Sequence, residues 1–233
     1  MKNITKLVLV FALTATSFFS CKNETKEQQE KSEVVETTTK TSQNKTEETT
    51  TKASTVLNAN LATEADLNSL ELPSEMVSQI LENRPFVSMN DLDAIFKIEN
   101  KEALYKKLFV PFNLNTTAEA DFKIIPGVGK KMAHEFEEYR PYTSVKQFKR
   151  EIGKYVDKTE VERYLNYVFV PVELNTASEA DINALPGVGN KMAHEFEEYR
   201  PYNSLTQFRK EIGKYVDDKE LKRLERFVYL KDK

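Results

Sequence analysis

A repeat of 60 residues within the chain sets the strongest limit on its fold. Residues 126–157 and 186–217 are identical at 26 of 32 positions. The segments that lead into them, 115–121 and 175–181, also match. Because the two copies are nearly the same sequence at a fixed period, each copy should form the same small structural unit, repeated in tandem.

A more divergent copy precedes these two. Residues 60–67 resemble the lead-in segments, and Arg84-Pro85-Phe86 corresponds to Arg140-Pro141-Tyr142. Between these points, residues 70–74 replace residues 125–130, with one residue fewer and no glycine. We therefore expect the first repeat to keep the scaffold and to lose the glycine turn.

The pattern within a repeat is helical. Thr116 and Thr176 are each followed three residues later by Glu119 and Glu179, which predicts capping boxes and a first helix over 117–125. A second helix follows the glycines and stops before Pro141. Its apolar residues recur at helical spacing, at Met132, Ala133, Phe136 and Tyr139.

Two more helices complete the repeat. Ser144 should cap a third helix that ends at Gly153, and Asp157 should begin a fourth that extends through Val168. No stretch alternates with period two for long enough to predict a strand. The predicted fold is all-α, with three repeats of about four short helices: tandem helix-hairpin-helix units preceded by a disordered tether.

Composition and the internal repeats together divide the chain into five segments. Residues 1–20 read as a signal peptide, with Lys2 and Lys6 before an apolar run too short to span a bilayer. Residues 21–55 are rich in Thr, Lys and Glu and contain too few apolar residues to fold, so they predict a disordered tether. The remaining segments are the first repeat at 56–110, the second at 111–170 and the third at 171–233.

Cys21 is the only cysteine and directly follows the apolar run. Its position resembles that of the lipobox cysteine of bacterial lipoproteins, although Phe18 replaces the usual leucine. That resemblance implies lipidation of Cys21, a membrane anchor and a place in the cell envelope, at the outer membrane. A plain secretory signal or an uncleaved anchor is the alternative.

All six glycines belong to the two later repeats. The turns Gly127-Val128-Gly129 and Gly187-Val188-Gly189 each precede a predicted helix. Glycine lets the backbone adopt positive φ and leaves no Cβ in front of the first amides of that helix. These amides can then face a phosphate.

Residues 115–140 resemble the helix-hairpin-helix domain of ComEA-like competence DNA receptors, and the likeness extends over 112–230 and weakly over 56–110. The capping box, the Pro-Gly-Val-Gly string and the terminal Tyr-Arg carry it. The resemblance implies paired hairpins in each repeat. At the second hairpin, Ile152-Gly153-Lys154-Tyr155 keeps a single glycine, which weakens it as a phosphate site.

The resemblance also implies sequence-independent binding of double-stranded DNA by backbone amides and lysines, in DNA capture or uptake. Val128 and Val188 would plug the turns, and salt should weaken binding. The implied phosphate-binding residues are Gly127, Val128, Gly129, Lys130, Lys131, Gly187, Val188, Gly189, Asn190 and Lys191.

The charge balance opposes this interpretation, because the net charge is −3. Glu135, Glu137 and Glu138 follow the first hairpin and could repel a phosphate. A local basic edge could be formed by Lys146, Lys149, Arg150, Lys154 and Lys158. An equally good interpretation is that these side chains only solvate the exposed faces of their helices. The second hypothesis is therefore a structural or protein-interaction envelope lipoprotein that retains the scaffold without binding DNA.

Other functions are disfavoured by the sequence. Residues 185–191 match the string that carries the nucleophilic lysine of helix-hairpin-helix DNA glycosylases, but no Val-Asp-Thr-His-like segment follows, so we expect no enzyme activity. His134 and Glu138 are too sparse for a zinc site, and we expect neither a metal nor a cofactor. Tyr139 and Tyr142 should close the helical core, with base stacking as the alternative.

Overall fold

The computed structural model describes residues 56–96 and 101–231. The predicted signal peptide at 1–20, Cys21 and the tether at 21–55 lie outside the described residues. Helices dominate the described part, as the sequence predicts.

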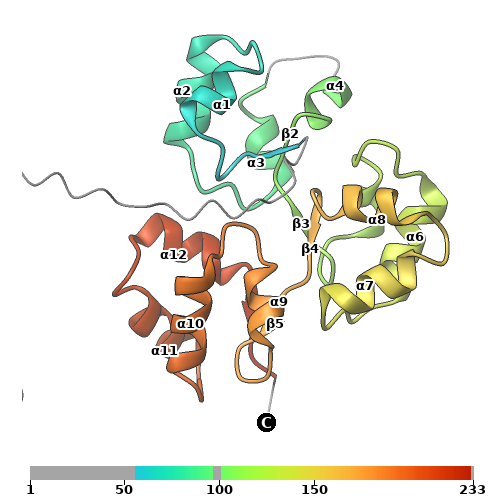
Figure 1. Cartoon of the computed structure of the whole chain (residues 1–233). Coiled ribbons are helices and arrows are strands. Elements are labelled where there is room, and N and C mark those ends of the chain that lie inside the picture. Colours follow the sequence, from blue (N-terminus) through green and yellow to red (C-terminus); the bar gives the residue numbers. More distant parts are fainter. Residues whose placement is uncertain (1–55, 97–100, 232–233) are drawn as a thin grey trace, which may run out of the picture. The chain divides into compact units, whose positions relative to one another are not determined.

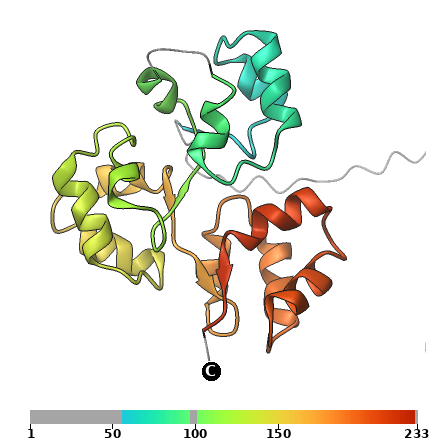
Figure 2. The ribbon, with the colours of Figure 1, turned by 180° about the vertical axis from the view of Figure 1, so that it is seen from behind.

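The helices occur in three successive groups of four (Figure 1). The helices of one group gather together in both views, as the orange to red group shows most clearly (Figure 2). Their bounds are α1 (Glu64–Asn68), α2 (Ser74–Glu82), α3 (Met89–Asp93), α4 (Glu102–Tyr105), α5 (Glu119–Phe122), α6 (Lys130–Glu138), α7 (Val145–Ile152), α8 (Lys158–Tyr164), α9 (Glu179–Asn183), α10 (Asn190–Glu198), α11 (Leu205–Ile212) and α12 (Asp218–Glu225).

Short parallel strands frame each group of helices, so the expectation of an entirely helical chain is wrong in this respect. Each strand has two residues, which is too short for a period-two pattern to be visible in the sequence. The pairs are β1 (Leu57–Asn58) with β2 (Leu108–Phe109), β3 (Phe112–Asn113) with β4 (Val168–Phe169), and β5 (Val172–Glu173) with β6 (Val228–Tyr229).

The predicted Thr-Glu capping boxes are also wrong. The N–H groups of Thr116 and Thr117 donate to Asn113 O, so Thr116 lies inside a turn that precedes the helix. Helix α5 consequently begins two residues later, with Ala118 at its N-cap and no side-chain cap. The same position is Ser178 in the third repeat and Thr63 in the first, and both side chains accept a backbone N–H.

The later helices of the second repeat follow the sequence pattern more closely. Ser144 caps α7 by accepting the Gln147 N–H, and Asp157 caps α8 by accepting the Glu160 N–H. Helix α8 ends at Tyr164 and does not extend to Val168, because Val168 pairs with Phe112 in the strand pair β3–β4.

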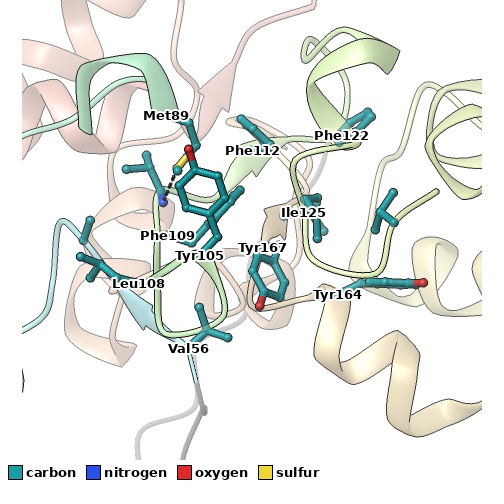
Figure 3. Packing of buried hydrophobic residues seen from close by; sticks show 14 of the residues in the cluster. Val56, Met89, Tyr105, Leu108, Phe109, Phe112, Phe122, Ile125, Tyr164 and Tyr167 are labelled. Atoms are coloured by element: carbon teal, nitrogen blue, oxygen red, sulfur yellow. Dashed lines mark hydrogen bonds between the residues drawn. The ribbon is translucent and has the colours of Figure 1, made fainter. Parts of the chain in front are cut away.

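Aromatic side chains form much of the core. At the junction of the first two repeats, the ring centroids of Phe109 and Phe112 lie 5.2 Å apart and those of Phe109 and Tyr167 4.9 Å apart (Figure 3). In the same cluster, the Val110 N–H donates to the Met89 sulfur at 3.1 Å. Tyr142 is fully buried, so its predicted place in the core is correct.

Candidate nucleic-acid interface

The two glycine hairpins have the same backbone geometry. Gly127 has φ +80° and Gly187 has φ +70°, a left-handed conformation that is costly for residues with a Cβ. The next N–H closes each turn: Val128 N donates to Ile125 O at 2.9 Å, and Val188 N donates to Leu185 O at 3.1 Å. Both valines are 5% exposed, so they plug the core side of the turn.

The second glycine of each hairpin is the N-cap of the following helix. Gly129 and Gly189 are extended, with φ −85° and −93°, and neither offers a side-chain cap. A Cβ on either glycine would meet no atom within 4 Å. The space beside the Cα of each of these two glycines is therefore open.

The first amides of α6 and α10 have no acceptor among the described residues. Within 56–96 and 101–231, the backbone N–H groups of Gly129, Lys130 and Lys131 donate no hydrogen bond, and the same holds for Gly189, Asn190 and Lys191. Helices α7, α8, α11 and α12, by contrast, carry Ser or Asp caps. Unpaired N–H donors at the positive end of a helix dipole favour an anion.

Charged side chains around the second-repeat hairpin add to this preference. Lys130 and Lys131 are both exposed on the first turn of α6. In the third repeat Asn190 replaces Lys130, so only Lys191 supplies a cation at that turn. The second repeat therefore presents the more positive hairpin.

The acidic residues behind the hairpin are less repulsive than their number suggests. Glu135 is buried, with 7% exposure. Glu137 pairs with Arg140 at 3.4 Å, and Glu138 lies 3.8 Å from His134. Glu137 and Glu138 lie near the far end of α6. At 1.5 Å per residue they are about 10 Å from its first residue, a distance of about one Debye length in 0.1 M salt.

The second turn of the second and third repeats cannot hold a phosphate in the same way. Gly153 has an ordinary helical φ of −62°. The carboxylate of Asp157 accepts the Glu160 N–H, so a negative charge already occupies the helix end. Asp217 does the same at α12. At the second hairpin that the resemblance implies, an aspartate therefore takes the place that a phosphate would have at the helix amides.

The first repeat retains the turn shape although it lacks glycine, which corrects the expectation that the turn would be lost. Glu71 has φ +60° and stands two residues before Pro73, the N-cap of α2. Gly127 stands in the same relation to Gly129. The shape is kept, but Glu71 and Glu75 bring negative charge to it, so this turn is poorly suited to an anion.

Arg140 and its counterparts serve the scaffold. The guanidinium of Arg140 donates to Leu114 O and Thr117 O. Arg200 donates to Leu174 O at 2.6 Å and to Ala177 O at 2.7 Å. The Tyr-Arg pair recurs in both repeats, and in both its arginine donates hydrogen bonds to backbone carbonyls. These arginines are therefore not free cations.

Sequence reasoning missed one feature near the hairpin, a pair of tyrosines. The hydroxyls of Tyr139 and Tyr155 lie 2.8 Å apart, and those of Tyr199 and Tyr215 2.7 Å apart. The hydrogen bond with Tyr139, followed by that with Glu135, raises the pKa of Tyr155 well above its usual value. The signal in the sequence was two tyrosines 16 residues apart in both repeats.

Neither histidine belongs to a metal site in the described ranges. His134 Nδ1 lies 3.3 Å from Glu119, and both side chains reach the surface. No group of three or more His, Cys, Asp or Glu residues within 56–96 and 101–231 is arranged to hold a metal ion. Over the same ranges, no helix has the length and apolar character needed to cross a membrane.

Comparison with known proteins identifies the motif. A family model described as a helix-hairpin-helix motif matches residues 168–229, which run from β4 to β6. Helix-hairpin-helix motifs generally bind nucleic acid. No curated protein and no solved structure matches the chain.

Proposed function

We propose that this protein is a non-catalytic, sequence-independent DNA-binding protein that holds duplex phosphates at the N-termini of α6 and α10. The observation that carries the proposal is the open amide site found at the same place in both repeats. In each, the N–H groups of the N-cap glycine and of the next two residues lack acceptors among the described residues, and the glycine offers no side-chain cap. Contacts of this kind recognise phosphate and carry no information about bases.

The two sites should differ in strength. Lys130 and Lys131 flank the amides in the second repeat, whereas Asn190 and Lys191 flank them in the third. Because each lysine that neutralises a phosphate releases counterions, affinity should fall steeply with salt. We expect the second repeat to supply more of the binding energy.

The biological setting rests on resemblance alone. The likeness to ComEA-like receptors and to lipobox cysteines supports a lipid-anchored protein of the cell envelope, at the outer membrane, that captures DNA for uptake. A tether over 21–55 would let the DNA-binding repeats reach away from the lipid.

The decisive experiment separates the backbone N–H from the lysine charge. Lys130 is the first residue of α6, where proline is well tolerated, and Gly129 is extended as a residue before proline must be. Lys130→Pro combined with Asn190→Pro removes one N–H from each site. The matched control, Lys130→Ala with Asn190→Ala, removes the same side chains and keeps both N–H groups.

Affinity for a duplex of about 20 base pairs would be measured by fluorescence anisotropy in about 50 mM salt. A hydrogen bond to a charged group contributes about 1.5–3 kcal/mol, so the proline variant should bind at least about tenfold more weakly than the alanine variant. Equal affinities would refute the amide mechanism. Absence of binding by the wild-type chain would favour the interaction-scaffold hypothesis.

A further inference from the structure

The tyrosine pair links the C-terminal end of α6 to the second turn within one repeat. Tyr139 is the C-cap of α6, and Tyr155 lies in the turn between α7 and α8. Their ring centroids are 6.3 Å apart, and the hydrogen bond between the hydroxyls fixes the rings relative to each other. Tyr199 and Tyr215 repeat this arrangement, also at 6.3 Å.

Each ring of the pair holds a lysine. Lys131 Nζ lies 5.7 Å from the centroid of Tyr155, and Lys154 Nζ lies 4.7 Å from that of Tyr139. Both distances are within the range of cation–π attraction, roughly 6 Å. One lysine comes from the phosphate-binding turn and the other from the second turn, so the pair orients cations from both.

The cluster around Lys154 keeps a net positive charge. Glu151 accepts from Lys154 and, at 2.5 Å, from Arg150, so one carboxylate faces two cations. These two cations hold the pKa of Glu151 below its usual range, Lys154 having the larger effect. In the third repeat Lys214 pairs with Glu211 and lies 4.9 Å from the Tyr199 centroid.

The position of this cluster matters because the second turn has no open amide site. Asp157 occupies the end of α8, so a phosphate near this turn would need a side-chain cation. Lys154 is exposed, and the neighbouring Tyr155 ring is 38% exposed, so both reach the surface beside Lys131.

We propose that the tyrosine pair positions Lys131 and Lys154 to contact two phosphates of the same DNA duplex, Lys131 at the hairpin amides and Lys154 at the second turn. This inference rests on the proposed function, since it extends the same interface. The lysine contact replaces the amide contact that Asp157 prevents. Tyr155 is a positioning residue here and need not touch DNA itself.

The test uses the full chain and the salt dependence of duplex affinity. Each phosphate neutralised contributes about 0.9 to the slope of log K against log salt. Lys154→Met keeps the side-chain stem and should lower the magnitude of the slope by about 0.9 and the affinity several-fold in about 50 mM salt. Lys107→Met, which removes an exposed lysine of the first repeat, is the matched control and should leave the slope unchanged.

Variants of Tyr155 test the positioning role. Tyr155→Phe keeps the ring and should bind almost as wild type does, whereas Tyr155→Leu removes the ring face and should reduce the slope. Circular dichroism and urea denaturation would confirm that each variant is folded. If Lys154→Met behaves like Lys107→Met, or if folded Tyr155→Leu keeps the wild-type slope, the inference is wrong.

These outcomes are separate from those of the proposed function. The hairpin mechanism fails if the proline and alanine variants at Lys130 and Asn190 bind equally. The second contact fails if duplex binding persists and the slope does not respond to Lys154 or Tyr155. A wild-type chain that does not bind duplex DNA overturns both.

Discussion

Asn115 and Tyr142 exchange two hydrogen bonds across 27 residues of sequence. The Asn115 side-chain amide donates to Tyr142 O at 2.8 Å, and the Tyr142 N–H donates to Asn115 Oδ1 at 2.8 Å. Asn175 and Tyr202 are joined in the same way, as are Asn60 and Phe86. This bridge ties the entrance of a repeat to the segment that follows its second helix, and so holds the hairpin between them.

Replacing Arg200, which lies two residues before Tyr202, should reduce stability. Arg200 donates from two nitrogens of one planar fork to Leu174 O and Ala177 O, and lysine cannot reproduce that geometry. With about 1 kcal/mol for each hydrogen bond, Arg200→Lys should lower the free energy of unfolding by about 1–2 kcal/mol. Urea denaturation measures this change. An unchanged midpoint would show that the carbonyls are satisfied without the guanidinium.

The two glycines of a hairpin should respond differently to alanine. Gly127→Ala places a Cβ on a residue with φ +80° and should cost about 1–2 kcal/mol. Gly129 is extended and its Cβ would meet nothing within 4 Å. For Gly129→Ala, the lower entropy of the unfolded chain offsets a poorer cap, so stability should change little. Thermal denaturation of both variants gives the comparison, which equal losses would contradict.

Removing the carboxylates at the second turns should strengthen DNA binding. Serine caps a helix as well as aspartate does, so Asp157→Ser with Asp217→Ser removes two negative charges while keeping both caps. A charge at a helix end contributes about 0.3–1 kcal/mol, so affinity should rise about two- to fivefold at low salt. Asp157→Ala with Asp217→Ala is the control and should lose about 1 kcal/mol of stability for each of the two caps. If the serine variant binds no more tightly, the second turns do not face DNA.

Alkaline conditions should destabilise the fold. Burial raises the pKa of Tyr164 to about 12, and burial also raises the pKa of Tyr142 and Tyr202. Because the unfolded pKa is about 10, the stabilisation is complete below about pH 10 and is lost as pH rises through the folded pKa. At about pH 11 each such tyrosine should cost about 1 kcal/mol relative to pH 8. Urea midpoints at both pH values test this, and Tyr164→Phe should show the smaller loss.

Cys21 determines membrane association if the lipobox resemblance is correct. Cys21→Ser should then move the protein from the membrane to the soluble fraction, because a lipid anchor with two or more acyl chains is lost. Fractionation of cells expressing either form measures the distribution. Retention of the serine form on membranes would instead indicate an uncleaved anchor.

The sequence predicts the helices where short-range chemistry dominates. The caps at Ser144 and Asp157 follow from spacing and side-chain type, and the structure places them so. Val128, which the family resemblance implies as the plug of the turn, is buried. The sequence did not predict the strands, the start of α5 at Glu119 or the turn at Glu71. Each of these depends on backbone partners more distant in sequence, or on strain that the rest of the repeat supports.

The sequence alone determined the repeat, the mostly helical character and the two hairpins, because helical periodicity and glycine act over a few residues. The tertiary structure decided how charge and aromatic groups are used. It buried Glu135, placed Asp157 on the helix end at the second turn, and set Tyr155 between Lys131 and Tyr139. These outcomes depend on which side chains meet when helices pack, and a linear pattern carries no such distances.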